Sequence, residues 1–145
     1  MKLVVQRSKE SSVTVDKKIV GKINFGLVVL VGFTHNDTLD DIKFLAKKLV
    51  NLRIFDDENH MMNKSILDVN GSILSISQFT LYADTKKGNR PSYVNAMKAS
   101  EARKMYDLFN DELKKYNINI QTGIFQSEML VNITNDGPVT IILEN

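Results

Sequence analysis

Cysteine is absent from this sequence of 145 residues, and histidine occurs only twice. Without a thiol the chain has no disulfide, no cysteine nucleophile and no zinc site built on sulfur. His35 and His60 lie in polar, loop-like stretches, and neither has a second histidine at the spacing of metal ligands. Each fits an exposed loop residue better than a catalytic base, and the acidic run 56–58 fits a solvated turn better than a cation site. We therefore expect no metal site and no cofactor.

Long apolar runs are also absent, and none approaches the length needed to cross a bilayer. Residues 1–7 have too short an apolar core for a signal peptide. The sequence contains no glycine-rich phosphate loop and no dinucleotide fingerprint. The net charge of +2 is too small to indicate a polyanionic partner, so such binding would depend on local patches. These absences predict a cytoplasmic protein with no membrane partner.

The composition, 43% hydrophobic and 25% charged residues, is typical of a globular protein, and the length suits one domain over residues 1–145. Short apolar or alternating stretches predict strands. They lie at 2–7, 13–15, 19–23, 26–32, 53–55, 72–77, 117–122, 129–134 and 139–143. Many short strands with two long helices predict an α+β fold rather than alternating βαβ units. We expect a single compact domain with a mixed, mostly antiparallel sheet or barrel-like core and two long helices packed on it.

The spacing of apolar residues predicts the two long helices. The first follows Asp37 and Thr38, either of which can cap it, and has a leucine-rich stripe over residues 39–52. Ser100 is expected to cap the second helix. Residues 93–97 are expected to form a short helix before it.

Residues 72–84 alternate between apolar and polar in their first half, which predicts a strand with one buried face. The second half places Ser77, Gln78 and Thr80 beside Phe79, just before a basic loop. Two interpretations stand: these side chains hold a polar substrate, or they cap the turn at a strand end. They suit attack of water on an activated ester, because backbone N–H donors supply about 3 kcal/mol each to a developing oxyanion. Thr80 fits a hydrogen-bonding role better than a nucleophile, since no lysine or histidine is near it in sequence.

Gly137 and Pro138 precede the last predicted strand and form a second place of interest. An X–Pro bond is cis in about 5–6% of cases, so the residues alone favour an ordinary trans turn. A cis bond would turn neighbouring carbonyl oxygens to one side, where they could accept from an ammonium group.

Two long motifs resemble the signatures of the D-aminoacyl-tRNA deacylase family. The first is Ser-Gln-Phe-Thr-Leu-Tyr-Ala-Asp at 77–84, followed by Lys-Lys-Gly-Asn-Arg-Pro-Ser at 86–92. The second is Asn-Asp-Gly-Pro-Val-Thr at 135–140. The resemblance implies a hydrolase of D-aminoacyl-tRNA esters that acts in translation quality control. Glycine has no side chain to reject, so we expect glycyl-tRNA to be cleaved as well. It also implies the acceptor end of tRNA as partner and a homodimer with its active site at the interface.

The resemblance further assigns catalytic roles to one cluster of residues. They are Ser77, Gln78, Phe79 and Thr80. These residues would line the pocket, and backbone N–H groups near Phe79 and Thr80 would polarise the ester carbonyl. The 2′-hydroxyl of the terminal adenosine would take the place of a side-chain base.

Substrate binding is assigned, again by resemblance, to a cross-subunit arrangement. A cis Gly137–Pro138 element, braced by Arg7, would enter the pocket of the other subunit. Its carbonyls would capture the α-ammonium and leave no space for an L side chain. Phe125 and Met129 would border the adenosine.

Three basic residues of the loop at 85–91 would contact acceptor-stem phosphates, or form only a solvated loop. They are Lys86, Lys87 and Arg90. The sequence departs from the family pattern at 123–129, where Gln126 replaces a usual glycine and is expected to narrow or reshape the adenosine side of the pocket. A second departure, at 24–26, is expected to have only a local effect.

Two other functions fit the same fold. One is a non-catalytic RNA-binding module, which is expected to have a broken Ser-Gln-x-Thr or Gly-Pro element, whereas both are whole here. The other is a related deacylase that removes mischarged L-amino acids and has a trans Gly–Pro bond. Arg7 and the intact motif at 77–80 argue against it.

Overall fold

The computed structural model describes residues 1–145 and contains ten strands, two α-helices and one 3-10 helix. The strands of the amino-terminal half are β1 (Lys2–Ser8), β2 (Ser11–Val15), β3 (Lys18–Ile23), β4 (Gly26–Gly32), β5 (Phe55–Asp56) and β6 (Met62–Lys64). Those that follow are β7 (Ser72–Ser77), β8 (Ile120–Thr122), β9 (Leu130–Asn132) and β10 (Asn135–Glu144). The helices are α1 (Leu39–Val50), α2 (Ala99–Lys114) and the 3-10 helix η1 (Phe79–Tyr82).

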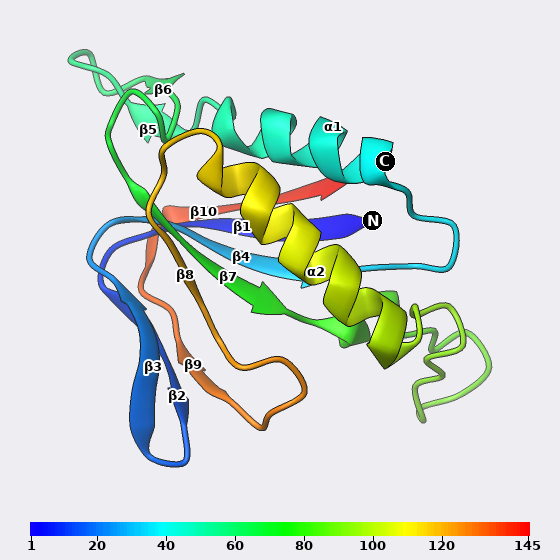
Figure 1. Ribbon diagram of the computed structural model, residues 1–145. Helices are drawn as coiled ribbons and strands as arrows, with labels where there is room; N and C mark the ends of the chain where they lie inside the picture. Colours follow the sequence, from blue (N-terminus) through cyan, green and yellow to red (C-terminus); the bar gives the residue numbers. More distant parts are fainter.

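A five-stranded sheet in the order β10-β1-β4-β7-β8 forms the centre of the molecule. β1 pairs antiparallel with β10 and β4, whereas β4–β7 and β7–β8 are parallel pairs. Both α-helices lie on one face of this sheet, as Figure 1 shows. A cluster of 23 buried residues fills the space between helices and sheet, with Leu3, Leu27, Leu45 and Phe109 fully buried in it. This burial is the main force that fixes the helices on the sheet.

The opposite face of the sheet is partly covered by a three-stranded antiparallel sheet in the order β3-β2-β9. A smaller core of five buried residues joins the two sheets, with Val13 and Ile23 on one side and Val28, Leu74 and Ile76 on the other. The two sheets do not close into a barrel. The predicted α+β class, with mixed pairing and two packed helices, is confirmed.

The ends of the helices agree only in part with the prediction. Thr38 caps α1 through a capping box with Asp41, as the sequence predicted for one of two candidates. The prediction that Ser100 caps α2 is wrong, because the helix begins at Ala99 after Lys98, which makes no side-chain cap. Residues 93–97 form a turn, with Ala96 N donating to Tyr93 O, so the short helix predicted there is also wrong.

β7 differs from its prediction as a strand with one buried face. It lies between two parallel neighbours, and Ile73, Leu74, Ser75 and Ile76 are all buried. Ser75 is inaccessible to solvent, and its hydroxyl has no hydrogen-bond partner. The alternation of serine and isoleucine therefore does not mark a solvent face, because α2 covers that side of the strand and Tyr106 donates to Ser75 O at 2.7 Å.

β10 contains an irregularity at the second motif. Gln6 of β1 pairs with Thr140 and Ser8 pairs with Asn135, so four residues of β10 stand opposite Arg7 alone. We call residues 136–139 the Gly–Pro bulge. The sequence predicted a turn before the strand, whereas the strand includes the segment as a bulge.

Candidate functional site

A cavity of about 330 Å³ lies where the parallel strands β4 and β7 end and α2 begins. The carboxyl ends of parallel strands are a common place for ligand sites, because the chain leaves the sheet there in loops. Most of its wall is apolar. It consists of Val31, Phe33, Ser77, Phe79, Tyr93, Ala96, Met97, Ala99, Ala102, Phe125, Gln126, Ser127 and Met129. We call this space the site cavity.

The site cavity brings together four residues to which the resemblance assigned catalytic or binding roles, from two distant parts of the chain. They are Ser77, Phe79, Phe125 and Met129. Phe79 is 55% exposed, and its ring meets that of Tyr93 edge-on with centroids 5.1 Å apart. The ring centroids of Phe125 and Tyr106 are 6.0 Å apart. Flat aromatic surfaces around an apolar hollow suit a planar base.

Gln78 and Thr80 do not belong to the wall of the site cavity. Gln78 N donates to Val31 O at 2.7 Å, and the Gln78 side-chain amide donates to the Thr80 hydroxyl. The strand therefore continues its hydrogen bonding one residue beyond Ser77 and then turns into η1. Phe79 and Thr80 are the first residues of η1, and the first N–H groups of a helix have no acceptor inside it.

No Asp, Glu, His, Lys or Arg lines the site cavity. Tyr106, behind the wall, is buried, and burial raises the pKa of its hydroxyl, which donates to Ser75 O. His35 bonds Val94 O through Nε2, and His60 is exposed on its turn. A reaction in this cavity must therefore use backbone groups, hydroxyls, amides or groups of the substrate itself.

Sequence reasoning missed several wall residues, among them Tyr93, Ala96, Met97 and Ser127. Nothing in their local pattern distinguishes them from ordinary turn residues. Gln126, at which the sequence departs from the family pattern, also lines the site cavity, and its φ of 63 lies in the left-handed region. A glycine adopts this conformation without steric cost, which explains the glycine at this point of the family pattern.

The Gly–Pro bulge lies at another part of the molecule. Its Gly137–Pro138 bond is cis, as the resemblance implies and contrary to what the residues alone favour. Arg7 Nε donates to Asp136 O at 3.1 Å, and Arg7 Nη1 donates to Ile54 O at 3.0 Å and Asp56 Oδ1 at 3.1 Å. The Arg7 side chain is buried beneath the bulge, whereas Gly137 and Pro138 are exposed.

The register of the sheet separates the bulge from the site cavity of the same chain. Ser77 pairs with Val31, which pairs with Leu3, whereas the bulge lies beside Arg7, four residues further along β1. β10 is also three strands away from β7. At about 3.3 Å per residue and about 4.8 Å per strand, the two features are about 20 Å apart. One chain cannot bring them together.

The loop with Lys86, Lys87 and Arg90 is exposed, and none of the three forms an ion pair. Asp84 accepts from Lys86 N at 2.9 Å and so fixes the start of the loop.

Neither α1 nor α2 has the length and hydropathy that crossing a bilayer requires.

Comparison with known proteins identifies the family. The family model described as D-Tyr-tRNA(Tyr) deacylase matches residues 4–144. A Bacillus cytotoxicus protein named D-aminoacyl-tRNA deacylase is 57% identical over 145 residues, covering 100% of this chain and 99% of that protein. A protein of the same name from Bacillus cereus strain AH187 is 54% identical with the same coverage.

Two solved structures share the fold. One is titled c-Myc DNA Unwinding Element Binding Protein, with a TM-score of 0.94, 40% identity, and coverage of 100% of this chain and 99% of that one. The other, titled as a structural analysis of a probable eukaryotic D-amino acid tRNA deacylase, has a TM-score of 0.85. It is 16% identical, covers 98% of this chain and 97% of that chain, and is a likeness of fold alone.

These matches define a deacylase class of α+β proteins, and the chain belongs to the D-Tyr-tRNA(Tyr) deacylase family. The enzyme class that the two sequence motifs indicated, a D-aminoacyl-tRNA deacylase, is confirmed at the level of the family.

Proposed function

We propose that this chain hydrolyses the ester bond of D-aminoacyl-tRNA, and of glycyl-tRNA, and that it works as a homodimer. The main support is the family membership together with a cavity whose wall has no acidic or basic side chain. An aminoacyl ester is already activated, so it needs a positioned water and an oxyanion site more than a strong base. Because tRNA is charged in the cytoplasm, we place the activity there.

In this proposal the terminal adenosine lies against Phe125 and Met129, and the ester carbonyl points to the amide groups at the start of η1, near Phe79 and Thr80. Water adds to the carbonyl, the acyl C–O bond breaks, and the 3′ oxygen of the adenosine leaves with a proton. The 2′-hydroxyl of the same adenosine assists the water. Two amide donors at the oxyanion would supply about 3 kcal/mol each.

Chirality is read by the Gly–Pro bulge of the second subunit. Two observations support this step: Gly137 and Pro138 are exposed, and the register keeps them about 20 Å from the site cavity of their own chain. Carbonyls of Gly137 and Pro138 would bind the α-ammonium and occupy the place that an L side chain needs. Glycine has no side chain to reject, so glycyl-tRNA is accepted.

The exposed cations Lys86, Lys87 and Arg90 would contact phosphates of the acceptor stem. None of the three side chains forms an ion pair within the chain, which leaves them free for such contacts. This step concerns affinity for tRNA and not the choice between D and L.

The direct test is a deacylation assay with D-tyrosyl-, L-tyrosyl- and glycyl-tRNA. We expect the first and third to be cleaved and the second to be spared. Ala96→Phe, which fills the site cavity, should abolish cleavage, whereas Leu108→Phe on the exposed side of α2 should not. Equal cleavage of D- and L-tyrosyl-tRNA would remove the chirality step. Cleavage of neither would favour an RNA-binding module.

A further inference from the structure

We propose that Asp37 is a positioning residue for the site cavity, although it lies outside the cavity wall. Its buried carboxylate fixes a turn at residues 34–37, and this turn holds residues 93–97, which we call the wall segment. The kinetic consequence rests on the proposed function, whereas the effect on the backbone does not.

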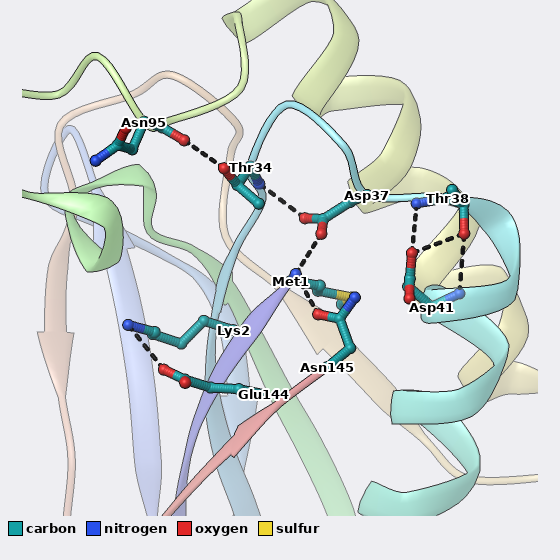
Figure 2. Close-up of polar contacts among 9 residues, drawn as sticks. All are labelled: Met1, Lys2, Thr34, Asp37, Thr38, Asp41, Asn95, Glu144 and Asn145. Atoms are coloured by element: carbon teal, nitrogen blue, oxygen red, sulfur yellow. Dashed lines mark hydrogen bonds and ion pairs between the residues drawn. The ribbon is translucent and has the colours of Figure 1, made fainter.

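Asp37 joins the start of β1 to this turn (Figure 2). Its side chain is 2% exposed and pairs through Oδ1 with the ammonium group of Met1, a residue that is itself buried. The other oxygen, Oδ2, accepts from Thr34 N at 2.7 Å, and Asp37 N donates to Thr34 O at 3.2 Å. Asn145, the residue after β10, also accepts from the Met1 ammonium through its side chain. A buried charge needs such a partner, so the carboxylate and the ammonium hold each other in place.

The turn at 34–37 in turn binds the wall segment. Thr34 Oγ1 donates to Asn95 O at 2.6 Å, and His35 Nε2 bonds Val94 O at 2.6 Å. Thr34 and Ala96 also form an isolated antiparallel β-bridge. The first of these bonds is drawn in Figure 2, where Asp37, Thr34 and Asn95 follow one another in a line.

The wall segment shapes the site cavity but has little structure of its own. Tyr93, Ala96 and Met97 line the cavity, and the Tyr93 ring packs against Phe79. The segment belongs to no helix or strand, and Met97 N donates out of it to Phe33 O at 3.0 Å. Three successive residues of the segment, 94–96, are bound by Thr34 and His35, so its position beside Phe79 depends on the turn at 34–37, and the turn depends on Asp37.

The test is Asp37→Asn, which keeps an acceptor for Thr34 N but removes the charge that pairs with Met1. We expect amide hydrogen exchange at Ala96 and Met97 to accelerate by about tenfold or more. We also expect KM for D-tyrosyl-tRNA to rise by about tenfold while kcat changes less, because binding geometry is lost and the reacting groups are not touched. Thr34→Val, which removes only the hydroxyl, should reproduce both effects more weakly and test the second link.

Asp41→Asn is the matched control. Asp41 is also an aspartate that binds a threonine, with Oδ2 accepting from Thr38 N at 2.8 Å and from Thr38 Oγ1 at 2.7 Å, but it contacts no part of the wall segment. It should lower thermal stability without changing KM or exchange at residues 93–97. Thermal stability alone would not separate the two variants, so exchange and KM are the deciding measurements.

Unchanged exchange at Ala96 and Met97 in both Asp37→Asn and Thr34→Val would overturn the proposal, even if the wild-type protein deacylates D-tyrosyl-tRNA. Equal acceleration in Asp41→Asn would also overturn it, because the effect would then be general loosening. If the wild type has no deacylase activity but Asp37→Asn loosens the wall segment, the proposed function fails and the positioning role stands.

Discussion

Among single residues, the surroundings of Thr80 bear most directly on the chemistry of the site cavity. Its hydroxyl accepts from the Gln78 side chain and does not line the site cavity. No acidic or basic side chain lines that cavity to take its proton. Thr80 therefore fits a residue that holds the start of η1 in place rather than a nucleophile.

Thr80→Ala should therefore keep appreciable activity. A hydrogen bond between neutral groups contributes about 1 kcal/mol. Even if all of this energy is lost from the active arrangement of η1, we expect kcat/KM to fall by about tenfold or less. Single-turnover deacylation of D-tyrosyl-tRNA measures this, with Thr80→Ser as the variant that keeps a hydroxyl. If Thr80→Ala folds and binds normally but loses all activity while Thr80→Ser retains it, Thr80 is the nucleophile.

The family resemblance could locate Ser77 and Phe79, which stand in its first motif, and Phe125 and Met129, which stand in the segment 123–129 where the sequence departs in part from the family pattern. It could not locate Asp37 as a structural anchor, since a cap for α1 was an equally good interpretation of that aspartate. The difference depends on the Met1 ammonium, which comes close only when β1 is paired in the sheet.

Among the elements, α1 is the one whose start the sequence defines most fully. Thr38 and Asp41 form a reciprocal capping box, Asp40 adds negative charge in the first turn, and Lys47 and Lys48 lie in the last turn. The capping box satisfies backbone N–H groups at the start of the helix, and the charged side chains at both ends complement the helix dipole. Hydrogen bonds from the Thr38 side chain and backbone hold the pKa of the Asp41 carboxyl below its usual value of 3.8.

A lowered pKa in the folded state means that Asp41 stabilises the protein above pH 3.8 and that this contribution is lost as the pH falls through the folded value. Asp41→Asn should therefore lower the free energy of unfolding by about 0.5 kcal/mol at pH 7, a small value because the group is solvated. Urea unfolding at pH 7 and at a pH below the folded-state pKa of Asp41 measures it, and the two proteins should converge in acid. A difference that stays constant with pH would contradict the electrostatic explanation.

The sequence patterns predicted β4 and α1 well, because a continuous run of branched residues fits a buried strand and a leucine stripe fits a packed helix. Of β10 they predicted only residues 139–143, and they placed a turn where the Gly–Pro bulge lies. β7 was misjudged for a physical reason. Serine usually faces water, but Ser75 lies under α2, and only tertiary packing reveals that. The start of α2 was misplaced because Lys98 supplies no side-chain cap for a sequence pattern to detect.

For the whole molecule, the central fact is the distance between the site cavity and the Gly–Pro bulge. The bulge depends on Gly137, whose φ is +129 and whose added Cβ would lie 2.7 Å from Val139 Cγ2 and 3.0 Å from Val139 N. An alanine at this position is strained, and the bulge must shift. The sequence could give the residues of the bulge but not its location, because the location follows from the register of β10 on β1.

A subunit-mixing experiment tests the central claim most directly. Ala96→Phe blocks the site cavity, and Gly137→Ala distorts the bulge, so each homodimer should be inactive on D-tyrosyl-tRNA. Unfolding the two together and refolding them should restore about a quarter of wild-type activity, since half of the dimers are mixed and half of their sites are intact. A mixture as inactive as its parents, with mixed dimers shown to be present, would contradict an active site built from two chains.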